Sequence, residues 1–219
     1  MQDKKYVWDV LVRVFHWSLV LAFIVSYLSG DEWQSLHVIS GYVILGLILV
    51  RLVWGIVGSK HARFSDFVRS PVAAFRYLKS LFSGSVAHYE GHNPAGGLMV
   101  VALLVSLLGT GFSGLKTLGY EGEGPFAIAR VTAIDNGAHA NISVSGSAEK
   151  ADADERHHSD QASTKEHEGE EFWEEIHEFF VNFTLLLVVL HLAGVYLSSR
   201  AHGENLVRAM ITGFKSGKE

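Results

Sequence analysis

The chain has 219 residues, of which 48% are hydrophobic and 19% charged, and its mean hydropathy is +0.21. That balance excludes an ordinary soluble domain of this length and is typical of a small membrane protein with one long polar segment. The absence of cysteine excludes disulfides, iron–sulfur clusters and covalently attached c-type haem. The formal net charge of −5 says little as a sum, so the placement of the charges along the chain matters more.

Four stretches of the sequence are long and apolar enough to cross a membrane. A bilayer core of roughly 30 Å requires about 20 mainly apolar residues as a helix. The four stretches are Val10 to Leu28, Leu36 to Val57, Gly97 to Leu115 and Ile176 to Leu197. Lipid cannot satisfy an open backbone, so each stretch is expected to be helical. The predicted fold class is therefore all-α, an integral-membrane four-helix bundle.

The basic residues outside these stretches, together with Arg13 near the start of the first one, predict the orientation. They gather near the N-terminus, in the second connector and in the C-terminal tail: Lys4, Lys5, Arg13, Lys60, Arg63, Arg69, Arg76, Lys79, Arg200, Arg208, Lys215 and Lys218. The first connector instead holds Asp31 and Glu32. The positive-inside rule therefore places both termini in the cytoplasm. We expect a multi-pass protein of the bacterial inner membrane, with the first and third connectors outside.

The second connector contains a further predicted helix. Ser70 and Pro71 are typical of a helix cap and first turn, and Phe75 and Leu78 follow on one face. Two interpretations stay open: a helix lying on the cytoplasmic membrane surface, or an amphipathic connector without lipid contact. Asn93 and Pro94 then introduce the third span.

The third connector, residues 116–171, is predicted to be an acidic, partly flexible periplasmic insert within a single transmembrane domain over residues 1–219. It is rich in Gly, Ala, Ser, Asp and Glu, and no regular structure is expected from Gly137 to Thr164. The role of its histidines stays open between metal binding and a solvated loop: His139, His157, His158 and His167.

Four histidines lie inside the predicted spans or at their ends: His16, His37, His177 and His191. An ionisable residue in a membrane helix indicates function by default, and imidazole is a common axial ligand of haem iron. In the predicted orientation, His16 and His191 lie in the inner half of the membrane, and His37 and His177 near its outer face. On the fourth helix, fourteen residues separate the two histidines, which is about 21 Å with a difference of about 40° around the axis. Two bis-histidine sites are therefore predicted, His37 with His177 and His16 with His191.

Arg51 is a further candidate cofactor-binding residue. It follows His37 by fourteen residues and so approaches the inner site on a similar face. Two interpretations stay open for its guanidinium: pairing with a haem propionate, or extension to the cytoplasmic head groups.

The sequence resembles the bacterial cytochrome b561 and nickel–iron hydrogenase b-type cytochrome subunit family, a group of four-helix dihaem cytochromes. The resemblance covers all four spans and both cytoplasmic ends but not the long insert. Its runs are Val7-Trp8-Asp9 to His16-Trp17, Leu36-His37-Val38, Gly41-Tyr42, Arg51-Leu52-Val53-Trp54-Gly55, Asn93-Pro94-Ala95-Gly96, His177-Glu178-Phe179, His191-Leu192-Ala193-Gly194-Val195 and Glu204-Asn205-Leu206-Val207-Arg208-Ala209-Met210.

This resemblance implies that the four matching histidines, His16, His37, His177 and His191, ligate two non-covalent haems b. It also implies electron transfer between the quinone pool and a periplasmic partner, a c-type cytochrome or a hydrogenase. Lipid and quinone are expected partners, and nucleic acid is not. Two alternatives remain, a self-contained quinone-dependent oxidoreductase acting on a small oxidant such as superoxide and a metal-ion transporter, so enzymatic activity stays open. The sequence also leaves open the direction of electron flow, the quinone site and the oligomeric state, a homodimer included.

Overall fold

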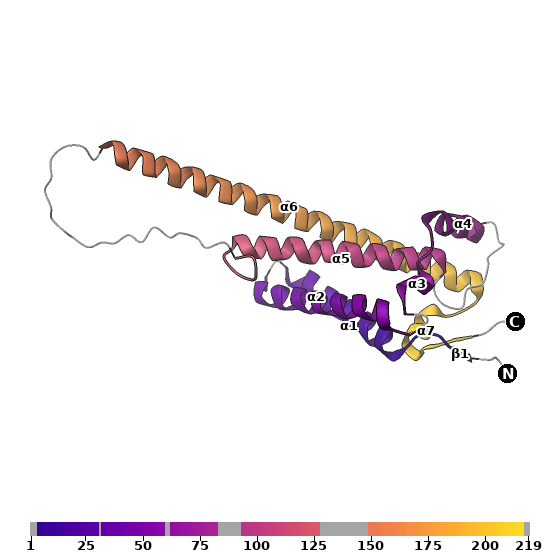
Figure 1. The fold of residues 1–219 in the computed structure, drawn as a ribbon. Helices are drawn as coiled ribbons and strands as arrows, with labels where there is room; N and C mark the ends of the chain where they lie inside the picture. Colours follow the sequence, from indigo (N-terminus) through magenta and orange to yellow (C-terminus); the bar gives the residue numbers. More distant parts are fainter. Residues whose placement is uncertain (1–3, 31, 60–61, 83–92, 128–148, 217–219) are drawn as a thin grey trace. The chain divides into compact units, whose positions relative to one another are not determined.

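The computed structural model describes residues 4–30, 32–59, 62–82, 93–127 and 149–216, and most of them are helical (Figure 1). The elements in chain order are β1 (Lys4–Tyr6), α1 (Val10–Ser29), α2 (Gln34–Val57), α3 (Phe64–Phe67), α4 (Pro71–Phe82), α5 (Pro94–Tyr120), α6 (Glu149–His202), α7 (Leu206–Thr212) and β2 (Phe214–Ser216). The all-α fold class is confirmed, with one pair of three-residue strands as the only addition among these residues.

Four helices are long and apolar enough to span a membrane: α1, α2, α5 and the part His167–His202 of α6. Each encloses one of the predicted stretches. Large apolar side chains on these helices stay exposed, and Leu28 and Ile56 are both 74% accessible. Such side chains suit contact with lipid rather than water. The prediction of a four-helix membrane bundle is confirmed.

The chain divides into two compact units. The first consists of Met1–Gly111 and Phe179–Glu219, and the second is Phe112–Glu178. Helices α5 and α6 contribute residues to both.

The core of the first unit lies between α1, α2 and α5. Helices α1 and α2 pack side by side (Figure 1). Their contact and the neighbouring face of α5 bury six apolar side chains: Phe15, Ala22, Ile44, Ile48, Leu104 and Leu107. Ile48 is completely inaccessible, so α2 carries the centre of this core.

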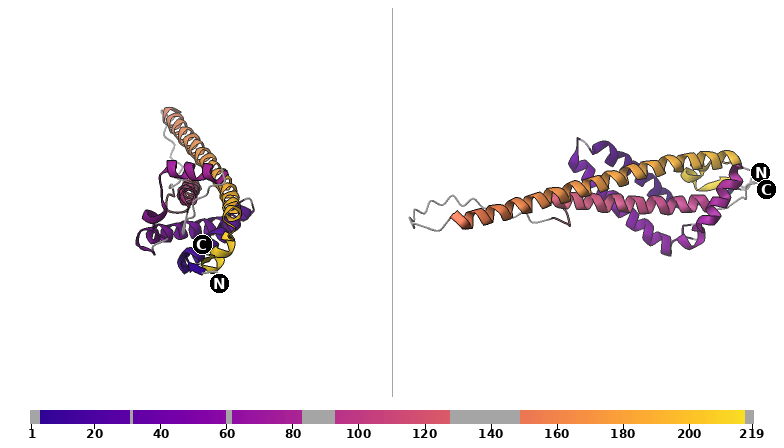
Figure 2. Two further views of the ribbon diagram at one scale, coloured as in Figure 1. Left: turned by 90° about the vertical axis from the view of Figure 1, so that its right-hand side faces the viewer. Right: turned by 90° about the horizontal axis from the view of Figure 1, so that it is seen from above.

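The two ends of the chain are joined in the first unit. Strand β1 pairs antiparallel with β2, with Lys4 opposite Ser216 and Tyr6 opposite Phe214. The rings of Tyr6 and Phe214 pack edge to face with centroids 5.3 Å apart. Two further views show the indigo segment before α1 close to the yellow segment after α7 (Figure 2). Both ends therefore lie on one side, as an even number of spans requires.

The predicted starts of α4 and α5 are confirmed. The Ser70 hydroxyl accepts a hydrogen bond from the Ala73 amide at 3.3 Å. Asn93 Oδ1 accepts one from the Gly96 amide at 2.7 Å, and its side-chain amide donates to Tyr77 Oη at 3.0 Å. The same amide lies 3.5 Å from Ser198 Oγ, so Asn93 joins α4, α5 and α6.

The long insert contains more helix than the sequence predicted. Helix α6 begins at Glu149, so residues 149–164, for which no regular structure was expected, are helical. Residues 128–148, which include His139, lie outside the described residues, as do Asp31, Lys60 and Lys218 of the orientation argument. The stretch from Glu149 contains no proline and is rich in Ala, Glu and Lys, and extending an existing helix avoids the cost of nucleation.

In the second unit, three aromatic rings lie around the amino group of Lys116. Lys116 Nζ on α5 lies 4.4 Å from the ring centroid of Phe126 and 5.9 Å from those of Phe112 and Trp173. Cation–π attraction and ring packing therefore fasten the segment after α5 to α6.

Candidate functional site

His16 and His191, from the first and the last span, come together in the first unit. Their ring centroids are 6.5 Å apart, with the ring planes inclined by 52°. Both residues are half-buried. His16 Nδ1 is enclosed and has no hydrogen-bond partner among the described residues.

This separation suits two ligands of one metal. A bond from a metal to an imidazole nitrogen is about 2 Å long. Each ring centroid lies roughly 1 Å behind its ligating nitrogen, so two imidazoles on one iron have centroids roughly 6 Å apart. The observed distance fits that requirement, and the unpaired nitrogen of His16 agrees with a ring whose partner is a bound group.

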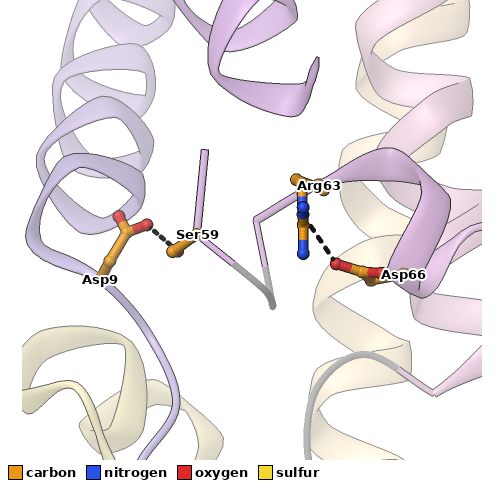
Figure 3. Close-up of polar contacts among 4 residues, drawn as sticks. All are labelled: Asp9, Ser59, Arg63 and Asp66. Atoms are coloured by element: carbon orange, nitrogen blue, oxygen red, sulfur yellow. Dashed lines mark hydrogen bonds and ion pairs between the residues drawn. The ribbon is translucent and has the colours of Figure 1, made fainter. Parts of the chain in front are cut away.

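The start of α1 is fixed to the end of α2 by Asp9. Asp9 Oδ1 accepts a hydrogen bond from the Val12 amide at 2.8 Å, which caps α1. Asp9 Oδ2 accepts hydrogen bonds from Trp54 Nε1, at 3.1 Å, and from Ser59 Oγ (Figure 3). The helix that carries His16 is therefore fixed at its first turn.

The same contacts set the ionisation of Asp9. Burial acts to raise the pKa of this carboxyl group, but the hydrogen bonds from Ser59, Val12 and Trp54 and the charge of Arg51 outweigh it. The pKa of Asp9 therefore lies below its ordinary value of 3.8. Asp9 remains an anion at neutral pH.

Arg51 is buried at the same end of α2. Its side chain is 3% exposed, and its guanidinium carbon lies 4.9 Å from the ring centroid of Phe64 and 5.8 Å from that of Phe67. The Nη1 atom has no hydrogen-bond partner in the part of the chain that the structure describes. Arg51 is thus enclosed by protein, and its buried Nη1 is an orphaned donor of the kind that an anionic group satisfies.

Two features hold the rings that cover Arg51. A Cβ atom at Gly55 would overlap the Phe64 ring, so only glycine lets this ring approach α2. The ion pair between Arg63 Nε and Asp66 Oδ2, at 3.1 Å, spans the short helix α3 that carries both rings (Figure 3). The position of Arg51 is therefore built into the fold.

The two outer histidines each have a polar neighbour at Nδ1. His37 Nδ1 lies 2.8 Å from the carbonyl oxygen of Ser26 on α1. His177 Nδ1 lies 3.2 Å from the hydroxyl of Ser113 on α5. His37 belongs to the first unit and His177 to the second. Their pairing stays a prediction.

The sequence reasoning did not identify Ser113. The third span has no histidine and was expected only to pack, and Leu104 and Leu107 do pack in the core. A signal was present, however. Hydroxyl residues recur along α5 with spacings of four, three and four, which places them on one helix face: Ser106, Thr110, Ser113 and Thr117.

The fold and the site define a membrane-spanning helical protein that brings histidines from different helices together. The chain belongs to the prokaryotic cytochrome b561 family, whose family model matches residues 7–213. It is thus a membrane b-type cytochrome that binds b-type haem and takes part in electron transfer. No curated protein and no solved structure matches the chain significantly.

Proposed function

We propose that this cytochrome holds two haems b and transfers electrons between the quinone pool and a periplasmic redox partner, a c-type cytochrome or a hydrogenase. The 6.5 Å separation of the His16 and His191 rings carries the proposal. These residues are 175 positions apart in the chain, so no local constraint brings them together. Haem b supplies an iron that alternates between the ferric and ferrous states when bound.

His16 and His191 would hold the iron of the inner haem, and His37 and His177 would hold that of the outer haem. Nδ1 of His37 and Nδ1 of His177 each lie next to an oxygen that can accept a hydrogen bond, so Nε2 would be the nitrogen of each ring that binds iron. Two ligand pairs at two depths provide a path across the bilayer, which a single haem does not.

Arg51 binds a propionate of the inner haem. A buried guanidinium is costly without an anionic partner, and Asp9 already accepts three hydrogen bonds from other residues. The free Nη1 of Arg51 is available for a carboxylate. A propionate supplies that charge.

The chain lies in the inner membrane with both termini in the cytoplasm, and the acidic insert faces the periplasm. The paired terminal strands support termini on one side. The acidic side chains attract a basic partner at long range, an effect that salt weakens. Quinone binds at one membrane face and the periplasmic protein at the other.

The test is haem quantitation with a reduced-minus-oxidised visible spectrum on the wild type and four variants, His16→Ala, His37→Ala, His177→Ala and His191→Ala. We expect two haems per wild-type chain. The His16 and His191 variants should lose one haem, and the His37 and His177 variants should lose the other.

His202→Ala is the matched control, because His202 is at the end of α6 and its Nδ1 contacts the Ser198 carbonyl oxygen at 3.0 Å. It should retain both haems. Retention of both haems after loss of His191 would contradict the proposal.

A further inference from the structure

A histidine that binds iron through one ring nitrogen presents the other as an N–H donor. The acceptor of that hydrogen bond fixes the ring orientation and makes the ring a stronger electron donor to the metal. Stronger donation favours ferric over ferrous iron and lowers the reduction potential. The group that accepts the hydrogen bond from Nδ1 therefore affects the reduction potential of the bound iron.

Ser113 lies in that position for His177. Its hydroxyl is 3.2 Å from His177 Nδ1, and Ser113 is only 1% exposed, so bulk water does not compete for the contact. The next residue makes the approach feasible. A Cβ atom at Gly114 would be 2.9 Å from His177 Cε1, so a glycine there lets α5 come close to the imidazole. Ser113 and Gly114 therefore both lie against the same edge of the His177 ring.

His37 and His16 do not share this arrangement. His37 Nδ1 is 2.8 Å from a main-chain carbonyl oxygen, which no side-chain substitution removes. His16 Nδ1 is buried without a hydrogen-bond partner among the described residues. Among these three Nδ1 atoms, only that of His177 has its oxygen neighbour described above on a side chain. A single small substitution can therefore remove this contact.

We infer that Ser113 is a positioning residue for the outer haem: it accepts a hydrogen bond from His177 Nδ1, holds Nε2 toward the iron and lowers the reduction potential of that haem. This inference rests on the proposed role of His177 as a ligand. It gives α5, which has no histidine, a direct part in setting the energetics of electron transfer.

The test compares Ser113→Ala with Ser106→Ala by redox titration and low-temperature electron paramagnetic resonance of the purified cytochrome. Ser106 is a suitable control because it lies on the same helix, is also 1% exposed, and bonds to Thr184 rather than to a histidine. The component that disappears in His177→Ala identifies the outer haem.

In Ser113→Ala we expect both haems to remain. The midpoint potential of the outer haem should rise, its ferric low-spin signal should shift, and the inner haem should be unchanged. Ser106→Ala should leave both potentials at their wild-type values.

Unchanged potentials and signals in Ser113→Ala, with one haem lost in His177→Ala, would refute the inference but leave the proposed function intact. Equal shifts in both serine variants would also refute it, because they would indicate a general effect on α5. Retention of both haems in His177→Ala would instead refute the assignment of the outer ligands.

Discussion

One oxygen of the Asp9 carboxylate caps α1, while the other accepts hydrogen bonds from Trp54 and Ser59. A neutral carboxylic acid accepts such bonds poorly, so the joint between the first two spans depends on the charge of this group. Because the pKa is lower in the folded state, the stabilisation is complete above the unfolded value of about 3.8 and is lost as the pH falls through the folded value.

Asp9→Asn should remove the negative charge and keep the helix cap, since asparagine caps helices as well as aspartate does. The variant therefore distinguishes the contribution of the charge from that of the cap. At neutral pH we expect a loss of stability on the order of 1 kcal/mol, from weaker hydrogen bonds. Thermal unfolding in detergent should show that wild-type stability falls more steeply than that of the variant as the pH decreases below about 4. Parallel pH profiles would contradict this account.

Gly55→Ala should disturb the ring that covers Arg51, because the new Cβ would overlap Phe64. We expect a loss of about 1–3 kcal/mol in unfolding free energy, typical of overpacking. Gly46→Ala is the control on the same helix, because a Cβ there would meet nothing within 4 Å. Its stability should match or exceed that of the wild type, and an equal loss in both variants would show that overlap with Phe64 is not the cause.

The residues proposed as ligands could be predicted from the sequence because depth in a membrane follows directly from residue number in a helix. The rings of His16 and His191 lie 6.5 Å apart, and their role as ligands stays a prediction. The residues that orient them could not be predicted, because a serine in a membrane helix often bonds to its own backbone. Only tertiary packing distinguishes Ser113, which contacts a histidine, from Ser106, which contacts Thr184.

In the first unit, contacts among three hydroxyl side chains join helices α5 and α6. Ser106 Oγ lies 2.6 Å and Thr110 Oγ1 3.3 Å from Thr184 Oγ1, and Thr184 is completely inaccessible. Phe180 adds a ring at Gly109, where a Cβ atom would overlap it. Hydrogen bonds and close packing, rather than the hydrophobic effect, are what hold helices together in lipid.

Thr184→Val should therefore weaken the contact between α5 and α6 with little change in volume. We expect a loss of about 1 kcal/mol, the usual size of an interhelical hydrogen bond in a membrane protein. Unfolding by sodium dodecyl sulfate would measure it. Thr212→Val is the control and should change stability less, because it removes a hydroxyl whose contacts are local, to the Arg208 carbonyl oxygen and the Phe214 amide. No difference between the two variants would argue against an interhelical role.

The four spans were predictable as elements, but the start of α6 was not. Apolar length marks a membrane helix without ambiguity, whereas the polar stretch from Glu149 lacks an apolar face and reads as disorder by composition. Its helix depends on continuity with the span that follows it. Local composition alone does not contain that information.

The terminal strands connect the beginning and the end of the molecule on one side of the membrane. Reporter fusions should confirm this arrangement and its proposed orientation. A fluorescent protein that folds only in the cytoplasm should fluoresce at either terminus, and alkaline phosphatase, which folds only in the periplasm, should be inactive at both. Opposite results at the two ends would exclude the four-span topology, and phosphatase activity at both would invert the orientation.

The meeting of His16 and His191 also has a consequence for biogenesis. The chain supplies the first ligand of the inner haem from its first described span and the second from its fourth, 175 residues later. If the two share an iron as proposed, the nascent chain cannot capture this haem by both ligands until the fourth span has been inserted. Loading of the inner haem then follows insertion of all four spans, and the bound haem holds the first of these spans to the fourth.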